Sequence, residues 1–237
     1  MKNIIGIDPS LISTGLVIGS GNDFKMFNYC RESDAYGKKG MSKWYKLADE
    51  HITYRFIEYR DFHDYSEGEL TKLKDYDKIT DMIIDDILSN INHNLETKVL
   101  IEGFNFGAQV GDLVDLVAFS TLLRKKLWDL VTHDINILSP STLKLESCKL
   151  TYEPEVKEIG GKNPRKEYKW RNNIGIPGGS FTKSDMFLSI VENKKFSDIW
   201  YKHCISIKND ILSVKTIKKP YEDINDAYLL YKIGEGY

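Results

Sequence analysis

A short apolar segment near the N-terminus limits the folds open to this chain. Residues 2–7 (KNIIGI) form a short apolar run that leads directly into Asp8-Pro9-Ser10, which predicts a buried strand closed by a turn. Residues 14–18 (TGLVI) predict a second strand, and residues 24–29 a third, with Gly-Ser-Gly at the turn between them. The chain is therefore expected to begin with a three-stranded meander whose first strand is central.

Helical and strand patterns alternate after the predicted meander. Isoleucines four residues apart predict a helix over about 76–91, and residues 98–101 (KVLI) predict a strand that ends at Glu102. Residues 135–138 predict another strand, and residues 141–148 a short helix. Thr182 is a plausible cap for a helix over 182–191, and the last helix is expected to begin near Tyr221. Strands early and alternating elements later indicate a mixed α/β fold.

Three parts of the chain carry weaker signals. A long helix is expected over about 110–131, and its apolar side chains are assigned to the core, namely Leu113, Val117, Leu123, Leu127 and Leu130. Part of that helix surface, near Phe119, is an alternative dimer seam. Residues 30–70 show no assignable period, and residues 149–180 predict a long loop or arm.

Four carboxylates occur at three separate places in this pattern. Asp8 and Glu102 each end an apolar strand, where an ionised carboxylate is costly unless something compensates it. Asp223 and Asp226 are three residues apart, so they share one face of the last predicted helix. Turn capping is an alternative for Asp8, and helix N-capping by Glu222 or Asp223 is an alternative for the third place.

A divalent cation accounts for all four carboxylates together. Mg²⁺ or Mn²⁺ prefers oxygen ligands and retains positions for water and phosphate. Two such ions about 3.5–4 Å apart can activate a water and stabilise the leaving oxygen in phosphodiester hydrolysis. The set predicts a catalytic metal centre made of Asp8, Glu102, Asp223 and Asp226, with two Mg²⁺ ions that Mn²⁺ can replace.

The net charge of −2 hides an uneven distribution. Residues 140–220 carry 16 basic and 9 acidic side chains, whereas residues 1–139 carry 16 basic and 22 acidic ones. Such a basic block is typical of proteins that bind phosphate backbones, although lysines that merely solvate a loop-rich region are an equal alternative. Basic and aromatic side chains alternate within it, which suits phosphate contact with base stacking, at Lys162, Arg165, Lys166, Tyr168, Lys169, Trp170 and Arg171. The alternative for Trp170 is packing against the core.

Five motifs in order resemble the RuvC family of Holliday junction resolvases, within the RNase H-like nuclease superfamily. Residues 4–10 with Thr14-Gly15 are similar to the family's opening strand, Asp-Pro-Gly turn and Thr-Gly. Ile101-Glu102 is similar to its second acidic position, and residues 140–144 (PSTLK) to its Pro-x-x-Val-Lys. Residues 182–186 (TKSDM) and 223–227 (DINDA) resemble its later lysine-bearing helix start and its Asp-x-x-Asp-Ala.

The resemblance implies a mixed five-stranded sheet flanked by helices, working as a homodimer on four-way DNA junctions in recombination and repair. Each subunit would cut one strand in a Mg²⁺-dependent site. Lys144 and Lys183 would contact backbone phosphates, while Phe104 and Phe106 only loosely match the family's aromatic residue that stacks on bases.

Departures from the family pattern indicate a divergent form such as a bacteriophage would encode. Ser10 stands in place of the usual glycine, and the segments at about 20–75 and 149–180 are longer than in typical bacterial members. We expect residues 1–237 to form a single nuclease domain with these segments inserted.

Composition narrows the remaining classes. No run approaches the roughly 20 apolar residues that a membrane helix needs, and the N-terminus has no export-signal pattern, so a cytoplasmic location is expected, that of the host for a viral protein. Three scattered cysteines suggest reduced thiols rather than disulfides or zinc. Three alternatives stay open: a flap or general branched-DNA endonuclease, a non-catalytic junction-binding module, and an actin-like or sugar-kinase-type ATP-binding protein.

Overall fold

The computed structural model describes residues 1–237 except 38–39, 59–62, 105–109, 160–164, 176–178 and 237, and of 110–112 and 165 only the backbone. Its centre is a six-stranded sheet in the order β4-β3-β2-β1-β5-β6. The strands are β1 (Asn3–Asp8), β2 (Ser13–Ser20), β3 (Asp23–Cys30), β4 (Ile52–Phe56), β5 (Thr97–Glu102) and β6 (Ile135–Leu138). β1, β2 and β3 form an antiparallel meander, while β5 and β6 continue the sheet parallel to β1. The predicted mixed α/β sheet is confirmed.

The prediction of five strands is wrong, because a sixth strand forms within residues 30–70. β4 pairs parallel to β3 at the sheet edge, with Met26 opposite Ile52. The mixture of polar and half-buried residues in ITYRF follows from its edge position, and this mixture hides the strand from an apolar-run criterion. The same segment also contains the π-helical turn η1 (Ser33–Gly37) and helix α1 (Ser42–Ala48).

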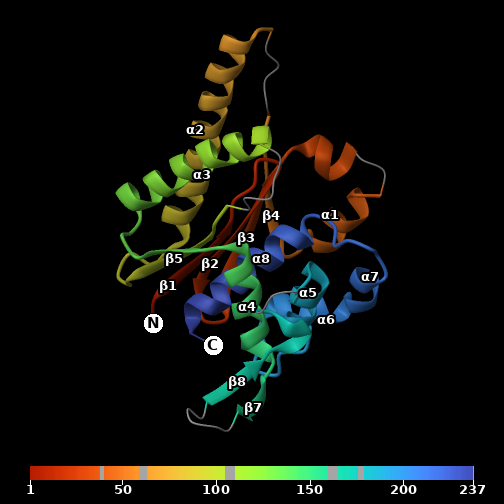
Figure 1. Cartoon of the computed structure of the whole chain (residues 1–237). Helices are drawn as coiled ribbons and strands as arrows, with labels where there is room; N and C mark the ends of the chain where they lie inside the picture. The colour runs from red at the N-terminus through yellow and green to blue at the C-terminus, as the bar shows by residue number, and fades with distance from the viewer. Residues whose placement is uncertain (38–39, 59–62, 105–109, 160–164, 176–178, 237) are drawn as a thin grey trace.

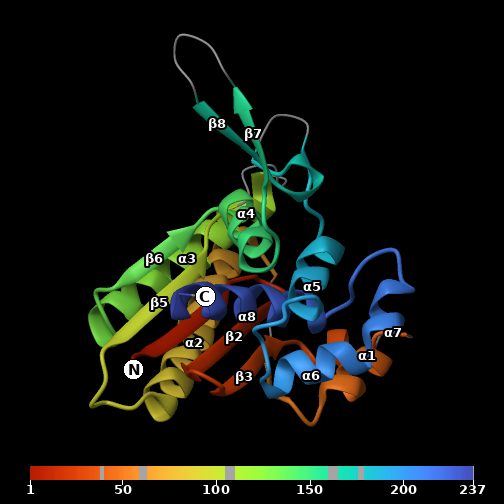
Figure 2. The same ribbon diagram turned by 90° about the horizontal axis from the view of Figure 1, so that it is seen from below.

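Helices cover both faces of the sheet (Figures 1 and 2). Alternate residues of β1 point to opposite faces, so Ile4 belongs to one core cluster and Ile5 and Ile7 to the other. On the Ile5 face pack α2 (Tyr65–Asn90) and α3 (Val110–Leu130). On the Ile4 face pack α4 (Pro140–Thr151), α5 (Lys183–Val191), α6 (Ile199–Ser206), α7 (Lys208–Leu212) and α8 (Tyr221–Glu235).

Two glycines let α8 lie directly on the sheet. A Cβ at Gly6 would stand 2.1 Å from the carbonyl oxygen of Ala227, and a Cβ at Gly15 would stand 2.4 Å from that of Asp223. No side chain larger than hydrogen fits at such distances, so β1 and β2 need glycine where the helix backbone crosses them. This close approach brings the acidic side of α8 to the end of β1.

Several sequence-based helix assignments need correction. α2 begins at Tyr65, well before the predicted start at residue 76. The prediction missed its first turns because they are mostly exposed and polar and carry no apolar period. In α3, Leu123 and Leu127 are buried as predicted, but Leu130 is 56% exposed. Phe119, near the suggested dimer seam, is 1% exposed and lies in the core.

The predicted arm at 149–180 contains an antiparallel hairpin rather than only loop. β7 (Glu155–Ile159) pairs with β8 (Arg165–Lys169), and the short 3-10 turn η2 (Arg171–Asn173) follows. The hairpin projects from the rest of the molecule (Figure 2). Its described side chains are mostly exposed, so no apolar alternation marks the strands in the sequence.

The helix starts beside the sheet are well capped. Ser139 accepts a hydrogen bond from the backbone of Thr142 at the start of α4, and Thr182 forms a capping box with Asp185 at the start of α5. The predicted cap at Thr182 is confirmed. These caps fix Lys144 and Lys183 near the N-terminal ends of their helices.

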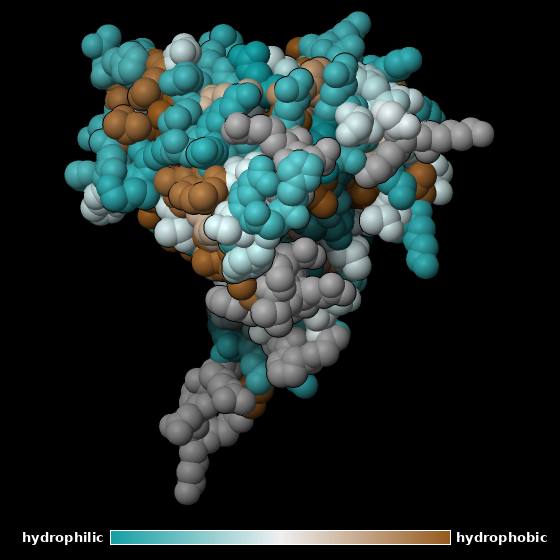
Figure 3. Space-filling view, turned by 90° about the horizontal axis from the view of Figure 1, so that it is seen from above, coloured by the Kyte–Doolittle hydropathy of each residue, from teal (hydrophilic) through white to brown (hydrophobic). Residues whose placement is uncertain are grey.

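The surface is largely polar. Hydrophilic side chains dominate the face in Figure 3, with apolar residues in small separate groups. Among the described residues, no helix combines the length and apolar character needed to cross a membrane.

Candidate metal centre

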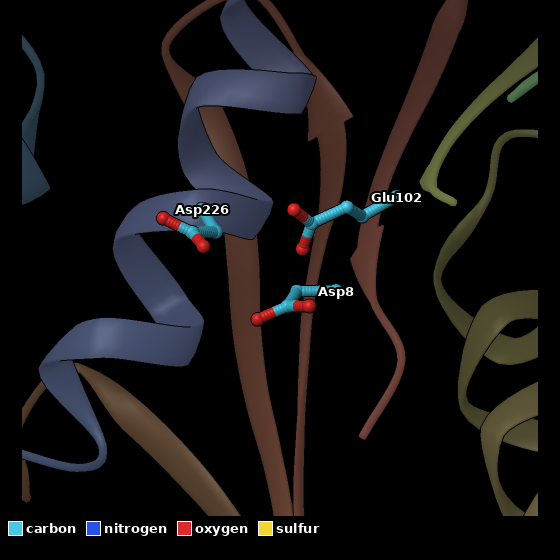
Figure 4. A group of neighbouring side chains, drawn as sticks. All are labelled: Asp8, Glu102 and Asp226. Carbon is cyan, nitrogen blue, oxygen red and sulfur yellow. The ribbon is translucent and has the colours of Figure 1, made fainter. Parts of the chain in front are cut away.

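Three of the four predicted carboxylates meet at the carboxyl ends of two central strands (Figure 4). β1 and β5 are parallel neighbours with Ile7 opposite Ile101, so Asp8 and Glu102 lie at the same end of the sheet. Asp226 approaches from α8, which crosses β1. One carboxylate oxygen of each residue lies within 4.8 Å of the others. Residues separated by up to 218 positions in the sequence thus form one acidic triad.

Burial makes this triad electrostatically expensive. Asp8 is 8% exposed and Asp226 is 1% exposed. Burial first, and then the charge of Glu102, raises the pKa of Asp8 well above its usual range. Burial and the charge of Asp226 raise the pKa of Glu102, and burial raises the pKa of Asp226 to about 7. The arrangement therefore stores repulsion that a bound cation would relieve.

Lys183 supplies part of the compensating charge. Its ammonium forms an ion pair with Asp226 from the first residue of α5. Burial alone would lower the pKa of Lys183, but the charges of the three carboxylates outweigh burial and raise it. The lysine is thus held charged within the triad.

Asp223, the fourth predicted ligand, lines the same cavity as Asp8 and Glu102 and accepts a hydrogen bond on each of its oxygens. Its Oδ2 accepts a hydrogen bond from Ser13 Oγ at 2.5 Å, and its Oδ1 accepts one from Lys219 Nζ at 2.5 Å. Asn28 Nδ2 donates in turn to Ser13 Oγ at 3.0 Å. Asp223 does not belong to the group of ligand atoms formed by Asp8, Glu102 and Asp226.

The contacts of these carboxylates do not match the alternatives of turn capping and helix N-capping. The N-cap of α8 is Pro220, and no side chain caps that helix, so N-capping by Glu222 or Asp223 is not observed. In the Asp8-Pro9-Ser10 turn, the side-chain hydrogen bonds join Ser10 and Thr14. Asp8 instead lines the acidic cavity.

The residues of the triad suit a hard divalent cation. A cavity of about 350 Å³ is lined by Asp8 and Glu102 of the triad together with Asp223, and its basic lining residues are Lys144, Lys183 and Lys219. Carboxylate oxygens are the ligands that Mg²⁺ and Mn²⁺ prefer, and an ion about 2.1 Å from each oxygen requires only small side-chain movements from separations within 4.8 Å. The three carboxylates together provide a site at which a divalent cation fits.

The predicted phosphate-binding lysines lie at this cavity. Lys144 and Lys183 line it from α4 and α5. A second cavity of about 750 Å³ adjoins it through Pro140 and Lys144 and is bordered by the hydroxyl-bearing residues Ser141, Thr142, Ser180 and Thr182. The basic and hydroxyl side chains thus extend from the acidic triad along the start of α4.

The two described aromatic residues that were predicted to stack on bases, Phe104 and Trp170, contact other parts of the protein in this structure. Phe104 packs against the guanidinium of Arg124, whose carbon lies 4.4 Å from the ring centroid. Trp170 is partly buried against the core, as the alternative interpretation expected, with Lys149 Nζ 5.8 Å from its ring. Phe106 lies outside the described residues.

The predicted basic residues of the arm lie on or beside the hairpin. Lys166 is 3.8 Å from Glu158, and Lys169 is 4.0 Å from Glu155, both exposed pairs of little energetic weight. Arg171 pairs with Glu192 at 3.0 Å. Arg165 is described by its backbone in β8 alone, and Lys162 lies outside the described residues.

Sequence reasoning missed Ser13, Asn28 and Lys219. Lys219 carried a usable signal, because it precedes Asp223 by four residues, which is the spacing of an ion pair on a helix. The others carried none, because Ser13 and Asn28 meet only through the pairing of β2 with β3.

Comparison with known proteins gives structural likeness without sequence likeness. No protein-family model matches the chain, and no curated protein matches it in sequence. T. thermophilus RuvC in complex with Holliday junction substrate is 9% identical, with a TM-score of 0.47 over 99% of this chain and 98% of that chain. The yeast mitochondrial Holliday junction resolvase Ydc2 is 11% identical, with a TM-score of 0.49 over 99% of this chain and 77% of that chain.

RuvC is also the name of the family that the sequence motifs resemble. Likeness at this level does not transfer an activity, substrate or partner to the chain, because those depend on its own side chains.

Proposed function

We propose that this chain is a divalent-metal-dependent endonuclease that cuts DNA at four-way junctions. The observation that carries the proposal is the convergence of Asp8, Glu102 and Asp226 within 4.8 Å, with Asp8 and Glu102 lining a cavity that basic side chains also line. A buried acidic triad beside basic side chains serves phosphodiester hydrolysis well, because the acids hold a cation and the bases hold the phosphate.

Asp8, Glu102 and Asp226 would hold Mg²⁺, with Mn²⁺ as a substitute. When bound, the cation lowers the pKa of water and polarises a phosphoryl oxygen. In the absence of a cation, Lys183 forms an ion pair with Asp226. When a cation neutralises the charge of Asp226, the Nζ of Lys183 would be free to contact a phosphate oxygen. Lys144 adds positive charge on the α4 side of the cavity.

The DNA would run from the triad across the start of α4 towards the hairpin. Ser141, Thr142 and Thr182 border the adjoining cavity and offer hydroxyl groups to a sugar-phosphate backbone. Lys166 and Lys169 extend the basic surface onto β8, and their exposed ion pairs exchange readily for phosphates. This path lies within the basic block of residues 140–220.

Symmetric cleavage of a four-way junction nicks two of its four strands, which requires two active sites. We therefore propose a homodimer of single-domain subunits, each of which cuts one strand, acting in the cytoplasm in recombination and repair, as the sequence resemblance implies. The two-fold axis of the dimer would relate the two active sites. Each site would then face one of two symmetry-related strands of the junction.

Incision assays with defined DNA substrates test the proposal. Four-way junction, flap and linear duplex DNA would be incubated with the full chain in Mg²⁺, in Mn²⁺ and in EDTA. We expect symmetric paired nicks in the four-way junction that depend on the metal. Equal cleavage of flaps would favour a general branched-DNA endonuclease, and no cleavage of any DNA by folded protein would defeat the enzyme assignment.

A matched variant separates cleavage from binding. Glu102→Gln retains the shape of the side chain and removes one metal ligand, while the proposed phosphate contacts come from α4, α5 and the hairpin. We expect Glu102→Gln to abolish cleavage and to bind a four-way junction with nearly wild-type affinity.

A further inference from the structure

The two faces of the projecting hairpin differ in chemistry. Residues directly opposite one another in an antiparallel pair lie on the same face, and alternate residues of a strand point to opposite faces. One face carries Glu155 opposite Lys169 and Lys157 opposite Glu167, and the other carries Val156 opposite Tyr168 and Glu158 opposite Lys166. Val156 is 51% exposed and Tyr168 is 56% exposed. An exposed apolar pair therefore lies beside a lysine on one face of the hairpin.

Packing within the chain does not account for this exposed pair. β7 and β8 form a sheet of two strands, and such a hairpin is marginally stable in water unless another layer covers it. The hairpin projects from the rest of the molecule (Figure 2), and its described side chains are mostly exposed. A tyrosine ring on such an arm adds little to the core, and its surface is accessible to another molecule.

Tyr168 also differs from the other aromatic residues of the basic block. Trp170 is partly buried against the core, and the guanidinium carbon of Arg171 lies 4.3 Å from the ring centroid of Tyr152. Of the aromatic side chains described within residues 140–220, Tyr168 is the one that is more than half exposed. Lys166 precedes it by two residues on the same face, about 6–7 Å away along the strand. Proteins that bind single-stranded nucleic acid use such a ring for a base and such a charge for the phosphate.

Three cavities lie in succession between the acidic triad and the base of the hairpin. The cavity of about 350 Å³ beside Asp8 shares Pro140 and Lys144 with the adjoining cavity of about 750 Å³. That second cavity reaches Ile174, and a third, of about 590 Å³, is lined among others by residues 169–173 at the end of β8. The cavities therefore mark a course for a DNA strand from the triad to the hairpin.

We propose that the Val156–Tyr168 face of the hairpin binds an unpaired base at the branch point of the substrate DNA. The ring of Tyr168 stacks on the base, Val156 packs beside it, and Lys166 contacts the adjoining phosphate. The inference rests on the proposed function and specifies which feature of the DNA the hairpin recognises. A paired base within a duplex has both faces stacked on its neighbours, so this surface can hold only a base that has left the stack.

A second copy of the chain is a weaker candidate for this face. Residues 140–220 carry 16 basic and 9 acidic side chains, so a contact between two copies of this surface would bring like charges together. The same excess of positive charge attracts the phosphate backbone of DNA. Charge thus favours a nucleic acid over a second copy as the occupant.

Binding measurements without cleavage test the inference. The full chain would be titrated in EDTA, by fluorescence anisotropy, against a four-way junction with two unpaired thymines at its branch point and against a fully paired linear duplex. We expect the wild type to bind the junction more tightly. Tyr168→Ala should weaken binding to the junction by about 5- to 150-fold, the range for one base stacked on an aromatic ring, and leave binding to the duplex unchanged.

Three further variants complete the design. Tyr168→Trp keeps a ring for stacking and should retain the wild-type preference for the junction. Tyr168→Thr removes the ring but keeps a residue suited to a strand, and it should reproduce the effect of Tyr168→Ala. Tyr65→Ala is the matched control, because it removes an 82% exposed tyrosine at the start of α2, and it should behave as the wild type does.

The dependence on salt separates base stacking from a general loss of the hairpin. Tyr168→Ala removes no charge, so its slope of log affinity against log salt should equal that of the wild type. Lys166→Ala removes one phosphate contact and should lower that slope by about 1. If both Tyr168→Ala and Tyr168→Thr lowered the slope, Tyr168 would support the hairpin rather than stack on a base, and the inference would be wrong.

The outcomes separate this inference from the proposed function. Equal weakening on both DNAs, or no change in either ring-free variant, would overturn the role of Tyr168 while metal-dependent cleavage by the wild type stood. Self-association of the wild type that Tyr168→Ala abolishes, measured by sedimentation, would assign the face to a second copy and also overturn it. No junction binding and no cleavage by the folded wild type would instead defeat the proposed function.

Discussion

Replacement of Glu102 by glutamine should make the metal-free protein more stable while removing its response to Mg²⁺. In the triad, Glu102 faces Asp226, Asp8 and the ammonium groups of Lys183 and Lys144. The change retains the shape of the side chain and removes its charge. Burial and the charge of Asp226 disfavour that charge and outweigh the hydrogen bond with Asp8 and the attraction of the two lysines, so the loss of the charge should relieve the folded state.

The size of the effect follows from the geometry. Oxygens of the three carboxylates lie within 4.8 Å of one another. Two unit charges at this separation interact by about 3 kcal/mol at an effective dielectric constant of about 20. The ammonium groups of Lys183 and Lys144 offset part of this repulsion, and partial protonation reduces the remainder, so we expect the free energy of unfolding to rise by about 1–3 kcal/mol. For a chain of this length, that corresponds to an increase in Tm of about 2–10 °C.

Calorimetry in EDTA and in Mg²⁺ provides the assay. With free Mg²⁺ at about one hundred times its Kd, the wild type should gain about 2.7 kcal/mol, whereas Glu102→Gln should gain almost nothing. Glu32→Gln, at an exposed carboxylate, serves as the matched control and should behave as the wild type does. A Glu102→Gln protein that is less stable than the wild type in EDTA, or that keeps the full Mg²⁺ response, would refute this reasoning.

Three further predictions concern other parts of the molecule. Lys232 is 0% exposed, and its Nζ lies 3.2 Å from Oδ2 of the buried Asp198. Lys232→Met should remove the ion-pair partner of Asp198 and lower the free energy of unfolding by about 3–5 kcal/mol, measured by urea titration. Burial, and then the charge of His51, lowers the pKa of His203 to about 4, so the unfolded state binds more protons below about pH 6.5. The stability present above that pH should decline as the pH falls from about 6.5 to about 4, and His203→Gln should flatten this decline in Tm. Reversing the charge of Lys166 and Lys169 together should weaken junction binding and lower the slope of log affinity against log salt by about 2 in metal-free fluorescence titrations, and an unchanged slope would remove the hairpin from the DNA path.

The central part of the fold was predictable because it is buried on both faces. The apolar segments before Asp8 and before Glu102 are strands, as predicted. A short, continuous apolar run is typical of a strand that is buried on both faces of a sheet. The edge strand β4 and the hairpin β7–β8 were missed, because exposed strands carry polar residues and their pairing depends on distant partners.

The same distinction applies to the candidate site. The convergence of Asp8, Glu102 and Asp226 could be anticipated, because strand ends and one helix face fix their directions. The separation of Asp223 from that group could not, since it depends on Ser13, which reaches Asp223 only because β2 lies under α8. Spacing along a helix indicates a shared face, but the neighbours across the helix decide what each side chain contacts.

The position of a bound ion is the most direct measure of the metal centre. Crystals of the full chain grown with Mn²⁺ would be measured at a wavelength at which manganese scatters anomalously. A strong anomalous peak coordinated by Asp8, Glu102 and Asp226 is the predicted result. Ordered carboxylates with no peak among them at saturating Mn²⁺, or a peak held by other residues, would contradict the assignment of this triad as the catalytic centre.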